Sequence, residues 1–158
     1  MSGLPRRLVR GWQHRIQPAD GYSAEGQSVV MVAIHQREPV GFFGGSVEVI
    51  VHDDDREVYL VVAADMVYVV PRYRGQGFSM DLSVATGIML RELLQAVYRA
   101  AAPHSEVNVI LRADIHTTGG DYFAGKLAES LGYELEVLKE EGRRRTIRIG
   151  SFDFEGGW

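Results

Sequence analysis

A strand that runs through a glycine turn directly into a long helix constrains this fold more than any other feature. Residues 58–70 form the most apolar run of the chain, interrupted by Asp65 and stopped at Pro71. The chain then turns through residues 74–77 (Arg-Gly-Gln-Gly), and a helical period begins at Phe78. The helix therefore begins close to the strand end, and its first N–H groups have no partner within the helix.

Such a helix start has two interpretations. It is an anion site, because the helix dipole places about half a positive charge there and glycines let a pyrophosphate approach the backbone. Alternatively, it is a tight connection in which glycine supplies a positive φ. The Walker A pattern is excluded because Phe78 follows Gly77. The dinucleotide fingerprint is excluded because Met80 stands where its third glycine is required.

Hydrophobic periodicity predicts the remaining organisation. The chain carries predicted strands at residues 28–36, 40–51, 58–70, 107–111, 134–139 and 144–149, and predicted helices at residues 78–102 and 122–131. The third strand is long enough to contain a bend or a bulge, and Gly132 is expected to end the second helix. After an N-terminal segment, the order β-β-β-α-β-α-β-β predicts one α/β (α+β) domain over residues 1–158. Its central sheet is expected to be mixed, mostly antiparallel and flanked by helices.

The composition of the chain argues against several classes of binding partner and catalytic site. Seventeen Lys and Arg residues against 21 Asp and Glu residues give a net charge of −4, which argues against nucleic acid or an anionic membrane as partner. The absence of cysteine excludes disulfides, cysteine zinc sites and a thiolate nucleophile. The histidines have no metal-site spacing, so no metal is expected. Without a signal peptide or an apolar run of membrane-spanning length, we expect a soluble, cytoplasmic protein.

The glycine turn carries a family resemblance. The pattern Val-x-Pro-x-Tyr-Arg-Gly-x-Gly at residues 69–77 resembles the acyl-CoA pyrophosphate loop of the GNAT superfamily of N-acetyltransferases, whose core is Arg/Gln-x-x-Gly-x-Gly/Ala. Arg74 and Gly77 match the first two fixed positions, and Ser79 replaces the final Gly or Ala. The predicted strand order also agrees with the fold of that family.

A second stretch supports the resemblance. Residues 121–133 are similar to the family pattern Asn-x-x-Ala-x-x-Leu-Tyr-x-x-x-Gly-Phe on the helix after the fifth strand. The positions in register are Ala124, Leu127, Gly132 and Tyr133, whereas Asp121 and Ala128 replace the Asn and the Tyr. The resemblance covers about residues 29–149.

This resemblance implies an acyltransferase that moves an acetyl or other acyl group from acyl-CoA to a primary amine of a small molecule or peptide. Acetyl-CoA would be the co-substrate. Backbone groups at Val69 and Val70 would hold the pantetheine and the thioester carbonyl, and Arg74 would support the pyrophosphate charge. The pyrophosphate itself would lie on Gly75, Gln76, Gly77, Phe78 and Ser79.

The chemistry requires a base, because an alkyl ammonium of pKa about 10.4 must lose a proton before it attacks. Asp65 is the candidate; the alternatives are that it marks a β-bulge or faces solvent. The family's tyrosine acid is replaced by Ala128, so Tyr122, Tyr68 or Ser130 would have to protonate the departing sulfur. A thiolate whose conjugate acid has a pKa of about 8.5 is also a fair leaving group without help.

Two questions stay open at this stage. The missing tyrosine also permits a catalytically weak or inactive CoA-binding module that acts through protein or nucleic-acid binding, with the basic N-terminus as the contact. The aromatic tail of Phe152, Phe154 and Trp158 is either an edge strand or a segment for homodimer formation.

Overall fold

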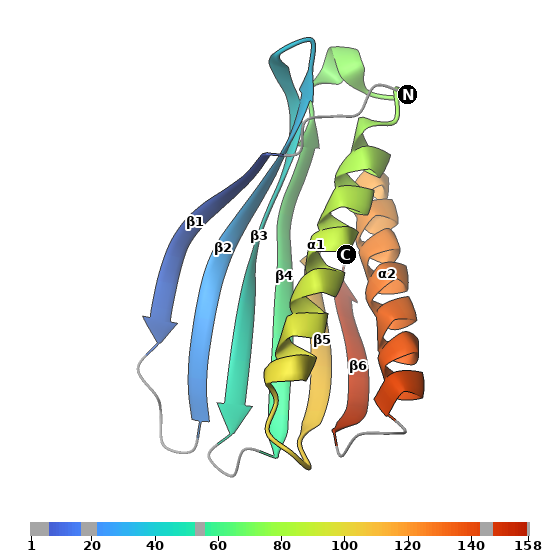
Figure 1. Ribbon diagram of the computed structural model, residues 1–158. Helices are drawn as coiled ribbons and strands as arrows, with labels where there is room; N and C mark the ends of the chain where they lie inside the picture. The colour runs from blue at the N-terminus through green and yellow to red at the C-terminus, as the bar shows by residue number, and fades with distance from the viewer. Residues whose placement is uncertain (1–6, 17–21, 53–55, 143–146, 158) are drawn as a thin grey trace.

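The computed structural model describes residues 7–16, 22–52, 56–142 and 147–157, with only the backbone for 7–16, 22–25 and 157. It is a six-stranded sheet in the order β1-β2-β3-β4-β5-β6 with two long helices (Figure 1). The elements are β1 (Arg7–Ile16), β2 (Tyr22–His35), β3 (Glu38–His52), β4 (Glu57–Val69), the 3₁₀ turn η1 (Pro71–Tyr73), α1 (Phe78–Ala100), β5 (Glu106–Asp114), α2 (Thr118–Gly142) and β6 (Arg148–Gly157).

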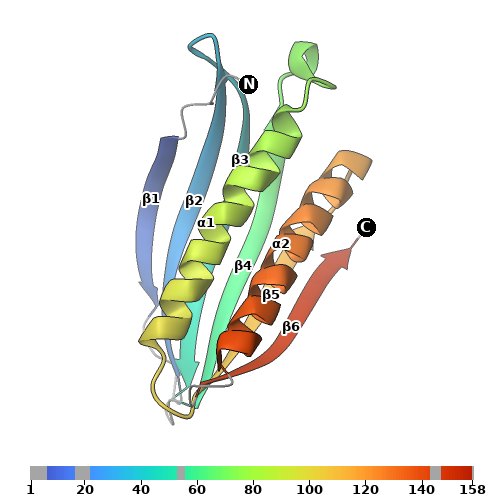
Figure 2. The same ribbon diagram turned by 45° about the vertical axis from the view of Figure 1, so that its right-hand side comes forward.

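The helices form a single layer on one face of the sheet. Both lie in front of the strands in Figures 1 and 2. α1 packs on β2, β3 and β4, while α2 packs on β4, β6 and α1. Between the layers lies an apolar core that includes Phe43, Leu60, Val62, Leu90, Leu94, Val109, Leu111, Leu127 and Leu131. The mixed α/β class is confirmed, and in the described residues both helices lie on one face of the sheet.

The first four strands form an antiparallel meander. The predicted hairpin between β2 and β3 is confirmed, with Gln36 and Arg37 at its tip. Both have positive φ, 49° and 69°, as a two-residue turn matched to the strand twist requires. β1 and the start of β2 lie in the N-terminal segment, for which the sequence predicts no defined element. β5 joins β4 in parallel and β6 joins β5 in parallel, so three neighbouring pairs are antiparallel and two are parallel.

β4 contains the predicted bulge, and Asp65 is the extra residue. Gly44 pairs with Met66 and Gly45 pairs with Ala64, which leaves Asp65 without a partner on β3. On its other side, β4 pairs with β5 only as far as Ala64. Beyond that point β4 stays paired with β3 and leaves β5. The sheet therefore opens between β4 and β5 from Asp65 onward.

The predicted strand at residues 134–139 is wrong, because α2 continues to Gly142. Gly132 does not end the helix. Beyond it, Leu135 and Leu138 extend the buried stripe that begins at Phe123, so burial continues the helical period. A Cβ at Gly132 would meet the Phe152 ring at 3.8 Å, an ordinary van der Waals distance, so a larger residue could also continue the helix here.

The last predicted strand, residues 144–149, lies partly outside the described residues, and the observed strand β6 begins only at Arg148. The aromatic tail therefore contributes to an edge strand of the sheet. Phe152 packs against the core, whereas Phe154 is exposed. Trp158 lies outside the described part of the chain. Within the described residues, neither helix combines the length and the apolar character needed to cross a membrane.

Candidate functional site

The opening between β4 and β5 holds a hollow of about 570 Å³, here called the loop hollow. It brings together the end of β4, the glycine turn and the first turn of α2. Its lining residues are Val67, Tyr68, Val69, Tyr73, Arg74, Gly75, Gly77, Phe78, Ser79, Thr117, Gly119 and Gly120. Most of the predicted pyrophosphate-binding residues therefore lie around one cavity.

The glycine turn presents bare backbone to this hollow. Gly75 and Gly77 have φ values of 75° and 90°, in the left-handed region that favours glycine. A Cβ added at either position would meet nothing within 4 Å, so the space above both is open. Gly77 caps α1, and the first helical bond runs from the Asp81 N–H to the Gly77 carbonyl. The preceding N–H groups, from Phe78 to Met80, thus have no partner in the helix.

A second helix start borders the same hollow. The Thr117 hydroxyl oxygen accepts a hydrogen bond of 3.0 Å from the Gly120 N–H, which caps the first turn of α2. Thr117, Gly119 and Gly120 line the hollow opposite the glycine turn. Sequence reasoning missed these residues. The signal was the Thr-Thr-Gly-Gly stretch at residues 117–120, which directly follows the fifth strand.

The end of β4 directs alternate backbone groups into the opening. The Val70 N–H donates to the Val40 carbonyl at 2.8 Å and is therefore used within the sheet. Because successive residues of a strand point their N–H groups to opposite sides, Val69 and Val67 point theirs away from β3. This places the Val69 N–H on the side that β5 has left. The Val70 N–H is therefore not free to donate to a ligand.

Two polar side chains of the turn have partners within the protein. Arg74 donates from Nε to the Val69 carbonyl at 3.0 Å, with its guanidinium 5.8 Å from the centre of the Tyr68 ring. It lines the hollow and contributes a positive charge there. Gln76 instead donates to the Arg72 carbonyl at 3.1 Å and does not line the hollow. Gln76 therefore holds the shape of the turn.

A smaller hollow of about 230 Å³, here called the bulge hollow, adjoins the first. It shares Val67, Thr117 and Gly120 with the loop hollow. The other lining residues are Phe43, Ala64, Asp65, Met66, Ala113, Asp114, Ile115, His116, Phe123 and Ala124. Asp65, the predicted base, is exposed at its rim together with Asp114 and His116, whose carboxylate oxygen and Nε2 lie 3.2 Å apart.

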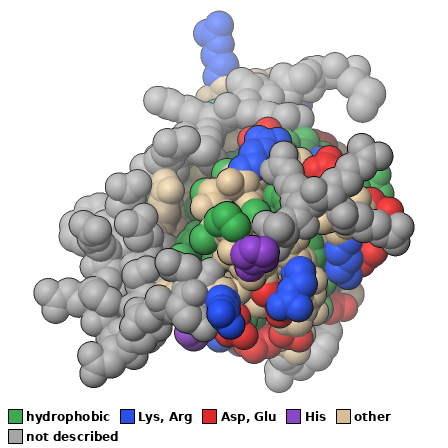
Figure 3. Space-filling model, turned by 60° about the horizontal axis from the view of Figure 1, so that its bottom comes forward, with side chains coloured by type: hydrophobic (Ala, Val, Ile, Leu, Met, Phe, Trp, Pro, Cys, Tyr) green, Lys and Arg blue, Asp and Glu red, His purple; other side chains and the backbone are tan. Residues whose placement is uncertain are grey.

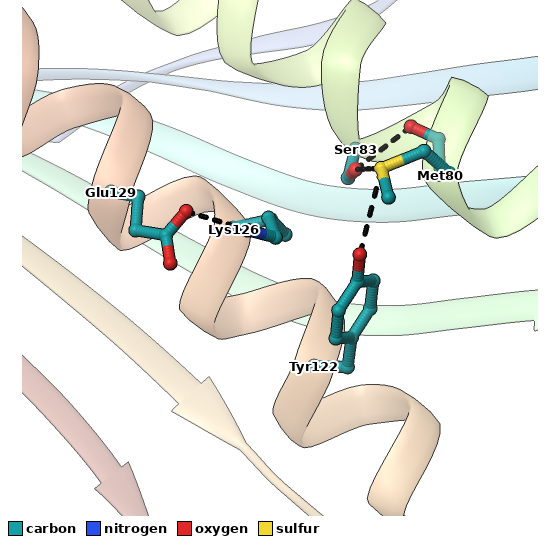
Figure 4. Close-up of polar contacts among 5 residues, drawn as sticks. All are labelled: Met80, Ser83, Tyr122, Lys126 and Glu129. Atoms are coloured by element: carbon teal, nitrogen blue, oxygen red, sulfur yellow. Dashed lines mark hydrogen bonds and ion pairs between the residues drawn. The ribbon is translucent and has the colours of Figure 1, made fainter.

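Tyr122, the predicted acid, lines neither hollow. Its hydroxyl donates to Met80 Sδ at 3.7 Å, across the first turns of the two helices (Figure 4). On the same helix Lys126 pairs with Glu129 at 2.7 Å, and this contact raises the pKa of Lys126. Of the other acid candidates, Tyr68 lines the loop hollow and Ser130 lies against Gly87 of α1. The structure thus does not bring Tyr122 to Asp65.

The described residues include no group of three or more potential metal ligands. At the end of the molecule opposite the glycine turn, the coloured basic and acidic side chains are interspersed, so neither sign dominates that view (Figure 3). The basic N-terminal side chains lie outside the described side chains. Comparison of the chain with protein-family models, with curated proteins and with solved structures gives no match.

Proposed function

We propose that this protein transfers an acyl group from an acyl-CoA thioester to a primary amine. The observation that carries the proposal is that the two hollows adjoin and share Val67, Thr117 and Gly120 in their linings. One end offers the free N–H groups of the glycine turn, and the other end holds the carboxylate of Asp65 at a strand bulge. A long ligand with an anionic end and a reactive end fits a cavity of this form.

The residues of the loop hollow suit the diphosphate of CoA. Gly75 and Gly77 leave their backbone uncovered, as a closely approaching phosphate requires. Two helix starts face the hollow, and each adds a partial positive charge. Arg74 adds a full charge, and its terminal nitrogens are not used in its bond to Val69. The thioester that CoA carries supplies an activated acyl group.

The remaining residues would support the transfer itself. The neutral amine nitrogen attacks the acyl carbon, a C–N bond forms, the C–S bond breaks, and the sulfur leaves as a thiolate. Asp65 would receive the proton that the amine loses. The Val69 N–H, directed into the opening, would stabilise the negative charge that develops on the carbonyl oxygen. Water would protonate the thiolate, because Tyr122 bonds to Met80 instead.

Two features differ from the GNAT pattern on which the proposal partly rests. Among the described residues after α2 there is one strand, β6, where the family order has two. Ala128, at the position of the family's tyrosine, is partly buried against the core. The proposal therefore depends on the cavity and the glycine turn, and the whole topology contributes less.

Thiol release tests the proposal directly. The purified protein is incubated with acetyl-CoA, butyryl-CoA and a panel of polyamines, aminoglycosides, amino acids and lysine peptides, and free thiol is followed with a thiol reagent. Because the chain has no cysteine, the protein contributes no background. We expect amine-dependent thiol release that falls at least about a hundredfold in Asp65→Asn, the loss typical of a removed general base.

Asp121→Asn is the matched control, since Asp121 is exposed at the start of α2 and lines neither hollow. It should leave the rate unchanged. CoA binding without thiol release for any amine would contradict the transferase and favour a CoA-binding module. If CoA also fails to raise the melting temperature, the assignment of the loop hollow is wrong.

A further inference from the structure

We infer that the bulge hollow accepts an uncharged acyl chain of about four to six carbons in preference to acetyl. This inference rests on the proposed function, which places the thioester beside the Asp65 bulge. It adds the chemical class of the acyl group. The size of the hollow, its apolar walls and the carboxylates at its rim support this assignment.

The hollow is larger than an acetyl group requires. A dry apolar cavity of about 150 Å³ holds benzene, with six non-hydrogen atoms. By the same ratio, the approximately 230 Å³ of the bulge hollow holds about nine non-hydrogen atoms. The thioester sulfur and the attacking nitrogen would occupy two of these places. About seven remain, which correspond to a carbonyl oxygen and a chain of six carbons.

The inner walls are apolar and fixed in place. The Phe43 and Phe123 rings stack with their centres 5.4 Å apart, and both side chains are only 2% exposed. Ala124 and Ile115 are buried beside them. These four side chains belong to β3, α2 and the segment after β5, so three parts of the fold form one surface. A hydrocarbon chain on this surface loses contact with water, which favours its binding.

Small residues make the space. Ala64 and Ala113 are direct partners across β4 and β5, at the last paired position before the strands separate. Both line the bulge hollow. A larger residue at either position would extend into the space that the inference assigns to the acyl chain. These two alanines are therefore the specificity-determining positions.

The walls and the rim of the bulge hollow suit different groups. An acyl chain that ends in a carboxylate would bury an unpaired charge among the apolar walls, which is unfavourable. Asp65 and Asp114 stand at the opening. The same carboxylates attract the ammonium group of an acceptor. The apolar depth thus suits the acyl chain, while the acidic rim suits the amine.

Calorimetric titration with a series of CoA thioesters tests this without knowledge of the acceptor. The probes are CoA, acetyl-CoA, butyryl-CoA, hexanoyl-CoA and succinyl-CoA. Each buried methylene is worth about a fourfold gain in affinity, so butyryl-CoA should bind at least about tenfold more tightly than acetyl-CoA. Succinyl-CoA, with the same number of acyl carbons as butyryl-CoA, should bind more weakly than butyryl-CoA.

Ala64→Leu should remove the preference for butyryl-CoA while the affinity for CoA changes less than about twofold. Ala63→Leu is its matched control, because Ala63 is the half-buried neighbour that lines neither hollow. It should retain the preference. Ala113→Leu repeats the test from the opposite strand if Ala64→Leu does not fold.

The two possible failures are distinguishable. Equal affinities of the wild-type protein for acetyl-CoA and butyryl-CoA, with CoA itself bound, would overturn the inference and leave the proposed function standing. An undiminished butyryl preference in both folded leucine variants would also overturn it. If the wild-type protein binds none of the five compounds, the proposed function fails and the inference fails with it.

Discussion

The hydroxyl group of Tyr122 donates a hydrogen bond to Met80 Sδ at 3.7 Å and thereby joins the first turns of α2 and α1. Ser83 approaches the same sulfur at 3.8 Å while its hydroxyl donates to the Met80 carbonyl at 2.8 Å (Figure 4). This contact lies close to the loop hollow without lining it. Tyr122 therefore has a structural explanation that competes with the predicted catalytic one.

Tyr122→Phe separates the two roles. A hydroxyl that only contacts Met80 at an exposed position contributes at most about 1 kcal/mol to stability. We expect acyl-transfer rates within about twofold of wild type, because an acid of this kind typically contributes at least about a hundredfold. Rates are measured by thiol release and stability by urea denaturation. A loss of about a hundredfold in rate, with stability retained, would restore the acid role.

Gly77→Ala tests the backbone conformation of the turn. Gly77 has φ of 90°, and an L side chain in the left-handed region costs about 1–2 kcal/mol. We expect this loss in urea denaturation, together with weaker CoA binding by calorimetry. Gly125→Ala is the control, since Gly125 lies inside α2 with nothing within 4 Å of the added Cβ. It should stabilise the protein by about 0.5–1 kcal/mol. Equal changes in stability for Gly77→Ala and Gly125→Ala would contradict the cost assigned to the left-handed conformation of Gly77.

Substitution by alanine is expected to destabilise the protein at only one of the two neighbouring glycines beside the bulge. A Cβ at Gly45 would overlap the Ala63 carbonyl oxygen and approach the Phe43 ring at 2.8 Å, whereas at Gly44 the nearest atom is 4.0 Å away. We expect Gly45→Ala to cost about 2–4 kcal/mol and Gly44→Ala to change stability by no more than about 0.5 kcal/mol. Thermal and urea denaturation measure both. A stable Gly45→Ala protein would show that the bulge relaxes freely.

Tyr59 predicts a response to alkaline pH. Partial desolvation raises its pKa above 10.0, with further contributions from Glu57, to which its hydroxyl donates at 3.3 Å. The folded state holds the Tyr59 proton more tightly than the unfolded state does. The Tyr59 hydroxyl therefore stabilises the fold at pH values below its pKa in the unfolded state, and this stabilisation is lost as the pH rises through its pKa in the folded state. The stability of wild type relative to Tyr59→Phe should therefore be smaller at about pH 11 than at about pH 8.

Urea midpoints at the two pH values measure this difference. Tyr133→Phe, at a tyrosine that is 66% exposed, is the control and should show no such trend. A difference between wild type and Tyr59→Phe that does not change with pH would contradict the role of this hydroxyl.

The central part of the fold was predictable because hydrophobic periodicity and turn residues indicate the same elements there. The β2–β3 hairpin, β4 with its bulge, α1 and β5 combine clear periodicity with turn residues at their ends. The sequence predicts an α2 that is too short, because a glycine at position 132 is typical of a helix end. Its continuation depends on non-local contacts. Glu134, only 5% exposed, accepts a hydrogen bond of 2.7 Å from Gln95 of α1. The sequence of residues 134–139 alone does not indicate this bond, because Gln95 lies on another helix.

Only the part of the candidate site that β4 and the glycine turn form was predictable from the sequence. The resemblance of the glycine turn led to residues that line the loop hollow, and the position of Asp65 within an apolar run indicated the bulge. Thr117, Gly119 and Gly120 were missed because they reach the hollow only through the parallel pairing of β4 and β5. Val70 and Gln76 have partners in the fold that the sequence does not indicate. The Val70 N–H donates to the Val40 carbonyl and the Gln76 side chain donates to the Arg72 carbonyl, and these bonds depend on the folded backbone.

The parallel pairing of β4 with β5 also orders the assembly of the protein. The meander from β1 to β4 needs only short loops, whereas β5 can join β4 only after the 23 residues of α1 have crossed the sheet. Long-range pairings of this kind form slowly. Since the loop hollow and the bulge hollow lie on this seam, we expect the site to be completed late in folding. A chain that has folded only its meander would hold a minority of the lining residues of each hollow and bind nothing.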